Sequence, residues 1–291
     1  MYKLSQQHPQ KRAFITGAGS GLGRELCLEL AKDNWTLGIC DISEKALNET
    51  AEIIAKNGGK PLAFLLDVSD KDRYKEVAGK FLAQAGGIDL LVNNAGVGDA
   101  AVFEEYGLEN WEWLVGINQM GVIYGCHYFI PSMKKQKSGQ IINVASIASV
   151  AVPPTMSAYN VTKAAVKALS ETLYSELKPF NISVSVMMPF FFRTNITQYA
   201  RGGRGSGETA HYLVHGSPVS ANEVATKALE LAGAGKFYIL LPKEAKFIYR
   251  MSRYFPLYLL KMNVKWAMNP DLMLKRAKKQ YDARMKGKKQ E

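Results

Sequence analysis

Short apolar runs alternate with longer amphipathic stretches along most of this 291-residue chain. Seven runs have the length of strands, and the stretches between them carry apolar residues at helical spacing: AFIT, TLGIC, LAFLL, DLLVN, QIINVAS, ISVSVMM and FYILL. Strands that are apolar throughout are covered on both faces, as in a parallel sheet whose crossover connections are helices. The pattern predicts a doubly wound parallel α/β fold, the Rossmann fold, as one domain over residues 1–242.

The composition narrows the class of protein. With 47% hydrophobic and 22% charged residues, the chain is neither disordered nor collagen-like. Three widely spaced cysteines supply neither a disulfide framework nor a Cys-x-x-Cys metal site, so a reducing compartment is expected. No apolar signal core opens the chain and no apolar run is long enough to span a bilayer, so we expect a cytoplasmic protein. The histidines lack metal-ligand spacing, and no metal is expected.

The formal net charge of +11 is concentrated at the C-terminus. Residues 243–291 hold 14 of the 37 Lys and Arg residues but only four acidic ones, so the body is almost neutral. This segment mixes basic and aromatic residues, and we expect a basic amphipathic helical extension. Three interpretations stay open: a surface that lies on an anionic membrane, a substrate lid or oligomer contact, and a solvated tail. Nucleic acid is not expected as a partner, because the body has no basic face by charge count.

A glycine-rich turn follows the first predicted strand. In T16GAGSGLG23 the glycines stand where that strand passes into a helix, so backbone amides and the helix dipole favour a pyrophosphate there. A purely structural turn is the alternative. Asp41 ends the second strand, 18 residues beyond Gly23, where a carboxylate can accept hydrogen bonds from an adenosine ribose diol.

The same carboxylate would repel a 2′-phosphate, and no Arg or Lys stands at Ala18, Ser20 or Ile42 to neutralise one. NAD is therefore predicted in preference to NADP. Alternatively, Asp41 serves only as the N-cap of the following helix.

Tyr159 and Lys163 are four residues apart in a predicted helix, so their side chains share one face. A neighbouring ammonium stabilises a phenolate and lowers the pKa of the tyrosine, which makes proton exchange feasible near neutral pH. On its own, this spacing is also common on solvated helix faces.

These motifs together resemble the short-chain dehydrogenase/reductase family, over about Arg12 to Leu241. T16GAGSGLG23 is similar to the TGxxxGxG turn of that family, Asp67-Val68 to its adenine-contacting pair, and N93NAG96 to its NNAG stretch. The resemblance implies a Rossmann-type fold, a nicotinamide cofactor and an NNAG segment that supports the sheet and lines the cofactor cleft.

The resemblance also implies a catalytic set of Ser146, Tyr159, Lys163 and Asn118. In the family, the serine binds the substrate oxygen, the tyrosine exchanges the proton, and the lysine lowers the tyrosine pKa and holds the nicotinamide ribose. The asparagine holds a water that links the lysine to solvent. The alternative for Asn118 is a buried amide that only braces its own helix.

The implied cofactor contacts come from the glycine turn, the strand ends and the catalytic helix: Gly17, Ser20, Gly21, Leu22, Gly23, Asp41, Ile42, Asp67, Val68, Asn94, Ala95, Gly96, Tyr159, Lys163, Pro189 and Thr194. The chain departs from the family after the sixth strand, where Phe190 replaces the usual glycine while Pro189 and Thr194 still match. Three adjacent phenylalanines cannot all face one way on an extended segment, so some belong to the core.

Apolar residues surround the expected substrate position, and the predicted substrate contacts are Ser146, Val152, Tyr159, Phe190 and Phe191. We therefore expect an NAD(H)-dependent oxidoreductase, a short-chain alcohol dehydrogenase or carbonyl reductase, that acts on a hydrophobic secondary alcohol or ketone. The alternative is a non-catalytic NAD-binding or scaffolding protein on the same fold. The resemblance also implies a homo-oligomer, a dimer or a tetramer. The glycine-rich residues 201–207 are predicted to form a loop, either a lid or a plain surface loop.

Overall fold

The computed structural model describes residues 3–196, 200–201 and 206–287. Its strands form one parallel sheet in the order β3-β2-β1-β4-β5-β6-β7. Their bounds are β1 (Arg12–Thr16), β2 (Thr36–Asp41), β3 (Lys60–Leu65), β4 (Leu90–Asn93), β5 (Gly139–Val144), β6 (Ile182–Pro189) and β7 (Tyr238–Leu241). All seven predicted strands are confirmed, with ends that differ by one or two residues, and the doubly wound fold is confirmed with them.

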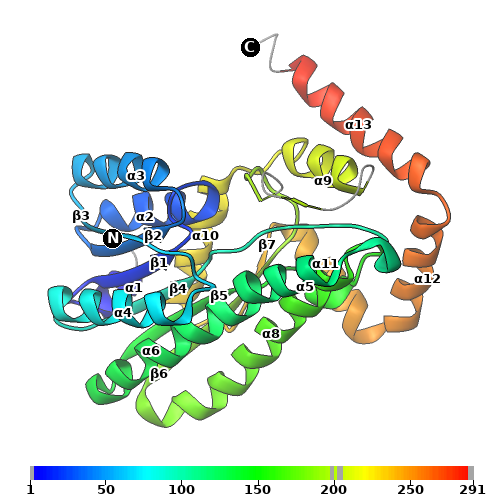
Figure 1. Cartoon of the computed structure of the whole chain (residues 1–291). Helices are drawn as coiled ribbons and strands as arrows, with labels where there is room; N and C mark the ends of the chain where they lie inside the picture. Colours follow the sequence, from blue (N-terminus) through cyan, green and yellow to red (C-terminus); the bar gives the residue numbers. More distant parts are fainter. Residues whose placement is uncertain (1–2, 197–199, 202–205, 288–291) are drawn as a thin grey trace.

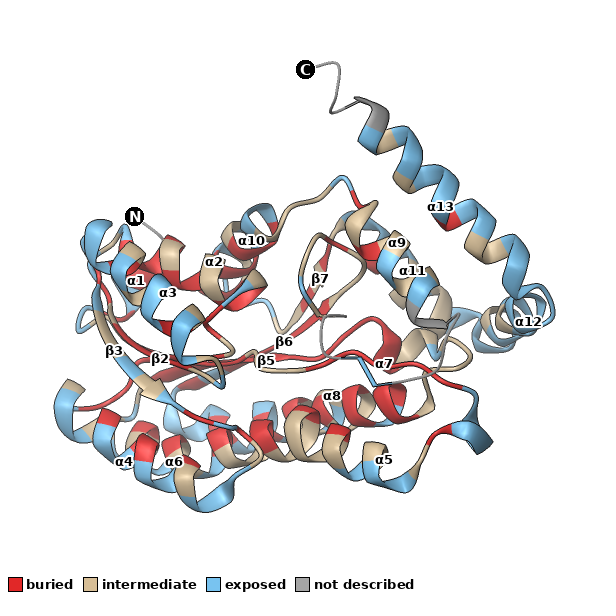
Figure 2. Cartoon of the chain, turned by 45° about the horizontal axis from the view of Figure 1, so that its top comes forward, coloured by how far each residue is buried: buried red, intermediate tan, exposed pale blue. Residues whose placement is uncertain are grey.

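Helices cover both faces of the sheet, and Figure 2 shows the buried strands between two helical layers. The helices of the body are α1 (Lys3–Gln7), α2 (Gly21–Ala31), α3 (Glu44–Lys56), α4 (Lys71–Ala85), α5 (Leu108–Val115), α6 (Gly121–Gln136), α7 (Ala148–Ala151), α8 (Ser157–Leu177), α9 (Ser206–His215) and α10 (Ala221–Gly233). One buried cluster joins α1, α2, α3 and α10 to the sheet, and a second joins α4, α6 and α8 to its other face. Short 3₁₀ turns lie at Phe103–Glu105 and Lys178–Phe180, and a π-helical turn covers Gly116–Met120.

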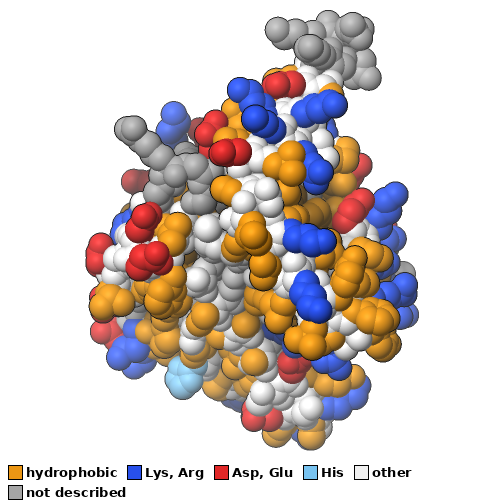
Figure 3. All heavy atoms as spheres, turned by 90° about the vertical axis from the view of Figure 1, so that its right-hand side faces the viewer, with side chains coloured by type: hydrophobic (Ala, Val, Ile, Leu, Met, Phe, Trp, Pro, Cys, Tyr) orange, Lys and Arg blue, Asp and Glu red, His pale blue; other side chains and the backbone are white. Residues whose placement is uncertain are grey.

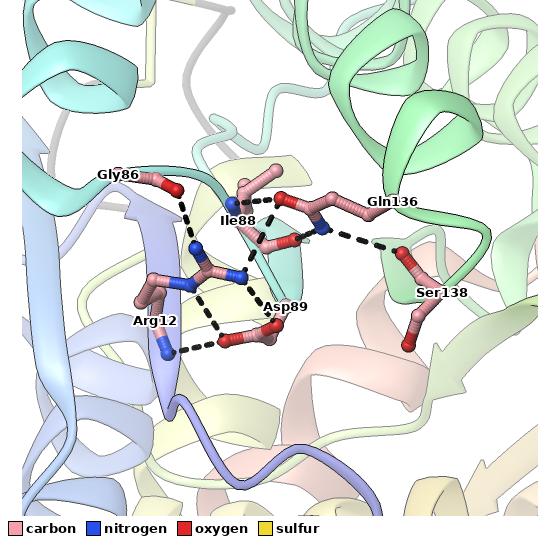
Figure 4. A network of polar contacts seen from close by, with 6 residues as sticks. All are labelled: Arg12, Gly86, Ile88, Asp89, Gln136 and Ser138. Atoms are coloured by element: carbon pink, nitrogen blue, oxygen red, sulfur yellow. Dashed lines mark hydrogen bonds and ion pairs between the residues drawn. The ribbon is translucent and has the colours of Figure 1, made fainter.

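A polar network fastens the amino-terminal edge of the sheet, at the opposite ends of the strands from the predicted site (Figure 4). The Arg12 guanidinium donates to both carboxylate oxygens of Asp89, each at 2.9 Å, and to the carbonyl of Gly86. The Gln136 side chain accepts from Ile88 N at 3.1 Å and donates to its carbonyl at 2.7 Å. The network joins the starts of β1 and β4 to the end of α6, so its role is structural.

The C-terminal extension forms three further helices, α11 (Lys243–Tyr254), α12 (Pro256–Ala267) and α13 (Pro270–Gly287). In Figure 1 they follow β7, and α12 and α13 run along one side of the body. The middle of α13 packs beside α9, where the rings of Tyr212 and Tyr281 are 5.4 Å apart and Ala277 is buried. Among the described residues, no helix has both the length and the apolar character needed to cross a bilayer.

The C-terminal extension and the loop at 201–207 were both predicted from the sequence. The extension does begin directly after the last strand, although its separation from 1–242 as a unit stays a prediction. The loop predicted at 201–207 runs into α9 at Ser206, and its residues 202–205 lie outside the described residues, so its interpretation as a lid also stays a prediction.

Candidate active site

The glycine-rich turn joins β1 to α2 and has no room for side chains. Gly17 and Gly21 have φ angles of 66° and 52°, a region that favours glycine. A Cβ on Gly23 would lie 2.1 Å from the carbonyl oxygen of Gly17, and one on Gly21 would lie 2.8 Å from Oγ1 of Thr194. The turn therefore brings the amino terminus of α2 and Thr194 together, where bare backbone amides can receive a phosphate.

Asp41 ends β2 beside this turn. Its Oδ2 accepts from Gly19 N at 2.8 Å and its Oδ1 accepts from Ser43 N at 3.0 Å. The N-cap of α3 is Ser43, whose hydroxyl accepts from Ala46 N, so the alternative role for Asp41 as that cap is wrong. The neighbouring Ile42 is 63% exposed, and its side chain is accessible at the edge of the turn.

Sequence reasoning missed Arg24, a cation close to the same turn. Its guanidinium donates to the carbonyl oxygens of Gly19 and Ala46, to Thr50 Oγ1 at 2.9 Å and to Glu49 at 3.3 Å. It stands in the first turns of α2, and only the packing of α2 against α3 brings it near the end of β2. Because these acceptors engage it, the guanidinium is a weaker partner for a further anion than a free arginine would be.

Asp67 and Val68 follow β3 and reach the same edge of the sheet. Asp67 is exposed, and its Oδ1 accepts from the amide and the hydroxyl of Ser69 at 2.9 and 2.7 Å. Val68 is 7% exposed and faces the position where a Cβ on Gly121 would lie. Asp67 is thus available to a ligand, whereas Val68 is mainly a packing residue.

The NNAG segment ties β4 to the glycine turn. Thr16 Oγ1 accepts from the amides of Asn94 and Ala95, both at 2.9 Å, and the Asn94 side chain donates to the carbonyls of Thr16 and Gly17. A Cβ on Gly96 would lie 3.0 Å from Asn118 Oδ1 and 3.2 Å from Lys163 Nζ. Gly96 is therefore the point at which the glycine turn and the predicted catalytic residues meet.

Ser146, Tyr159 and Lys163 converge at the carboxyl end of β5, and all are at most 8% exposed. Ser146 follows β5, and its hydroxyl accepts from Ala148 N at 3.1 Å. Tyr159 and Lys163 project from one face of α8, and Lys163 Nζ lies 5.8 Å from the centre of the Tyr159 ring. Lys163 also donates to the Val144 carbonyl at 3.0 Å, so β5 holds the ammonium in place.

Burial is the largest influence on the pKa values of Tyr159 and Lys163. It raises the pKa of Tyr159, and a hydrogen bond with Ser146 acts in the opposite direction. Burial lowers the pKa of Lys163 to about 8. We predicted from the resemblance that Lys163 lowers the tyrosine pKa, but in the protein alone the lowering contact is Ser146, because Lys163 points past the ring to the Val144 carbonyl.

Asn118 is fully buried in the π-helical turn between α5 and α6. Its Oδ1 accepts from Val97 N and its Nδ2 donates to Val97 O, both at 2.8 Å, with a longer contact to Thr162 at 3.5 Å. The side chain thus holds a neighbouring loop, which differs from the brace of its own helix that we considered. The extra residue of the π turn is a local feature that the apolar pattern does not reveal.

The segment after β6 carries the three phenylalanines. Phe192 is buried in the core, whereas Phe190 and Phe191 are half-buried and meet edge to face with ring centres 4.7 Å apart. The expectation that some of them belong to the core is confirmed. Pro189 ends β6, and its carbonyl accepts from Ile147 N at 3.0 Å, next to Ser146.

The predicted wall residue Val152 follows α7 with a φ of 42° and is 39% exposed. A residue of the extension holds this strained position, because Asn263 Nδ2 in α12 donates to the carbonyls of Ala151 and Val152 at 2.7 and 3.0 Å. Nothing in the sequence around Asn263 indicates this contact, since the partners are more than 100 residues apart.

A second buried pair lies beside α8 and was also missed. Tyr106 Oη donates to Asp99 at 2.6 Å, and burial together with this contact raises the tyrosine pKa. Arg201 N also donates to Asp99 at 3.3 Å, and its guanidinium lies 4.1 Å above the Trp113 ring. The position of Asp99 three residues after the NNAG stretch was the available signal.

The amino-acid sequence is similar to those of known oxidoreductases. The family described as short chain dehydrogenase matches residues 11–204. The chain is 34% identical to a 3-oxoacyl-[acyl-carrier-protein] reductase of Thermotoga maritima over 188 residues, 65% of this chain and 76% of that protein. It is 36% identical to the probable oxidoreductase EphD of Mycobacterium tuberculosis over 183 residues, 62% of this chain but only 31% of EphD.

Solved structures of related proteins have the same fold as this chain over most of its length. A short chain dehydrogenase/reductase from Burkholderia phymatum in complex with NAD has a TM-score of 0.80 and 32% identity, over 85% of this chain and 95% of that one. An alcohol dehydrogenase from Thermococcus sibiricus complexed with 5-hydroxy-NADP has a TM-score of 0.67 and 26% identity, over 76% of this chain and 89% of that one. One of these two neighbours thus holds NAD and the other holds 5-hydroxy-NADP.

Proposed function

The chain belongs to the short-chain dehydrogenase family, and from this premise we propose that it transfers hydride between NAD(H) and a hydrophobic secondary alcohol or ketone. The observation that carries the proposal is the meeting of Ser146, Tyr159 and Lys163 beside Gly96, which joins them to the glycine turn. A nicotinamide dinucleotide supplies the hydride chemistry when it is bound. It would be held by the glycine turn, Asp41, Asp67 and the NNAG segment at the edge of the sheet.

Each side chain of the catalytic group has a separate task. Tyr159 gives its proton to the substrate oxygen in reduction and accepts it in oxidation. Ser146 donates to the same oxygen as negative charge develops there. Lys163, with a pKa near 8, is able to exchange protons close to neutral pH. Asn118 positions the loop that carries Gly96.

The preference for NAD rests on Asp41. Its carboxylate stands at the end of β2 beside Gly19, where a 2′-phosphate would meet negative charge. The nearby Arg24 is already engaged by Glu49 and two carbonyl groups, which reduces its capacity to neutralise a phosphate.

The apolar character of the substrate rests on the residues that flank Ser146 and Tyr159. Phe190 and Phe191 are half-buried beyond β6, and Met156 and Val152 precede α8. Removing an apolar chain from water against such walls contributes about 0.8 kcal/mol per buried CH₂. Turnover should therefore rise with the length of the apolar chain.

The experiment is NADH oxidation with ketones of increasing chain length, for the wild type and Tyr159→Phe. We expect kcat/KM to rise along the series in the wild type and kcat to fall by about 10²- to 10⁴-fold in the variant, with NADH affinity nearly unchanged. Full activity in Tyr159→Phe would refute the assigned acid. Better turnover of small polar hydroxy acids would refute the hydrophobic substrate.

We extend the proposal to assembly and location. The neighbouring helices α5 and α8 expose Leu108 and Val161, which suit a contact with a second copy in a dimer or tetramer. A Val161→Glu variant should lower the mass measured by light scattering, and an unchanged mass would contradict this interface. The three cysteines are free and buried, which fits a cytoplasmic enzyme, and the basic extension fits contact with a membrane surface.

A further inference from the structure

Helix α12 is apolar and almost fully exposed. Leu257 in the helix and Met268 directly after it are 72% and 74% exposed, and within the helix only Leu259 and Asn263 are half-buried. The other large exposed residues on and beside the helix are Phe255, Tyr258, Leu260, Met262, Val264 and Trp266. A contiguous apolar surface of this kind marks a contact that the isolated chain does not make.

A basic hollow adjoins the start of this helix. It has a volume of about 630 Å³ and lies between α10, β7 and α11. Its lining combines apolar residues and tyrosines with four cations, Lys236, Lys246, Arg250 and Arg253. Tyr254 also lines it and directly precedes Phe255, so the hollow and the apolar helix are continuous along the chain.

The cations of the hollow outnumber the acids that face them. Within the described part of the chain, no carboxylate lies within ion-pair distance of any of the four. Glu171, a nearby acid, interacts electrostatically with Arg253, but it also binds Lys167 at 2.7 Å and Tyr238 Oη at 2.5 Å. The hollow therefore carries an excess of positive charge beside aromatic rings, which suits a phosphate ester.

The positive charge of the extension favours a lipid surface, rather than a second copy of the chain, as the partner of α11 and α12. Residues 243–291 carry 14 basic and four acidic residues, so two such segments in contact would repel each other. Figure 3 views the side of the molecule where α12 and α13 lie, and it shows basic and apolar side chains together there. Aromatic and basic residues in this mixture are typical of the interface between lipid headgroups and acyl chains.

We propose that α11 and α12 dock the enzyme on an anionic bilayer, with lipid headgroup phosphates in the basic hollow and α12 in the interface. The inference rests on the proposed membrane contact and adds to it the site and the lipid charge. Twelve residues of helix are about 18 Å long, well short of the hydrocarbon core, so α12 lies along the surface. Through Asn263, the same helix holds Val152 beside the substrate position, so docking brings that loop to the lipid.

The test is co-sedimentation with vesicles of phosphatidylcholine alone and of phosphatidylcholine mixed with phosphatidylglycerol. The hollow variant combines Lys246→Glu, Arg250→Glu and Arg253→Glu. The α12 variant combines Leu257→Gln, Val264→Gln and Met268→Gln. A control variant makes the same charge change on distant exposed lysines: Lys60→Glu, Lys75→Glu and Lys135→Glu.

We expect the wild type and the control to bind the anionic vesicles and to bind phosphatidylcholine alone weakly. At about 1 kcal/mol for each basic residue, the hollow variant should lose roughly a hundredfold or more in affinity. The wild type should keep part of its vesicle binding at high salt through apolar contacts, and the α12 variant should lose this salt-resistant part. Absence of wild-type binding, or equal losses in the hollow and control variants, would overturn the proposal. So would a halved mass of the α12 variant in light scattering, which would identify a second copy as the occupant.

Turnover of a water-soluble ketone without vesicles separates this proposal from the proposed reaction. All four proteins should turn it over equally, because none of the changed residues lies in the catalytic group. An inactive wild type that still binds anionic vesicles would refute the reaction and leave the docking surface intact. Inorganic phosphate added as a competitor distinguishes a free anion from a bilayer, and complete displacement at low concentration would refute docking on lipid.

Discussion

Replacing Asn118 by leucine removes both hydrogen bonds that hold the loop after β4. In the wild type, the amide and the carbonyl of Val97 each meet the Asn118 side chain at 2.8 Å, and Asn118 is 0% and Val97 9% exposed. Leucine has a similar volume but no polar atom. The variant thus leaves two backbone groups buried without a partner.

Each buried polar group without a partner costs about 1–3 kcal/mol, so the loss of two partners should lower the free energy of unfolding by roughly 2–6 kcal/mol. For a chain of this size, this loss corresponds to a midpoint of thermal unfolding lower by roughly 3–10 °C. Turnover should also fall well below that temperature, because Gly96 and Lys163 meet beside the released loop.

Urea unfolding followed by circular dichroism measures the change. Asn48→Leu on the exposed face of α3 is the matched control and should stay within about 0.5 kcal/mol of the wild type. If Asn118→Leu loses less than about 1 kcal/mol, the loop does not depend on this side chain and the argument from its hydrogen bonds fails.

Three further predictions concern the cofactor, the buried lysine and the extension. Asp41→Ala should raise the ratio of NADP to NAD in kcat/KM by about tenfold or more through loss of charge repulsion, and an unchanged ratio would count against Asp41 as the selector. The pKa of Lys163 is about 8 in the folded protein against a usual 10.5. As the pH rises, the folded state therefore loses this proton before the unfolded state does. Between pH 8 and 10.5, the unfolding free energy of the wild type should rise by about 3 kcal/mol relative to that of Lys163→Met. Below pH 8, the difference in unfolding free energy between the two proteins should be constant. Urea titrations at each pH check this, and a pH-independent difference contradicts it. Asn263→Leu releases Val152, so KM for hydrophobic ketones should rise about threefold to tenfold while KM for NADH stays constant, and steady-state kinetics that show equal changes in both would contradict the contact.

Much of the fold and half of the site could be predicted from short segments. Each strand of a parallel sheet is an uninterrupted apolar run, and the spacing of the glycines between Gly17 and Gly23 predicts a phosphate-binding turn. The helical spacing of Tyr159 and Lys163 indicated a candidate pair, but only the family resemblance singled out that pair and Ser146 as a catalytic set.

The remaining site residues depend on contacts between distant segments. Arg24 reaches the end of β2 only because α2 packs against α3, and Asn118 contacts Val97 from a π-helical turn. The pKa directions likewise follow from burial of Tyr159 and Lys163, which no local pattern measures. Each of these features is a property of packing.

The extension gives the clearest contrast. Its charge, its aromatic content and its helical character were evident in the residues after Lys243, because composition and period are local properties. Its three interpretations could not be separated in the same way. Only the folded chain shows that Asn263 reaches the active-site loop while the apolar residues of α12 face outward, since exposure depends on which neighbours the rest of the chain brings into contact.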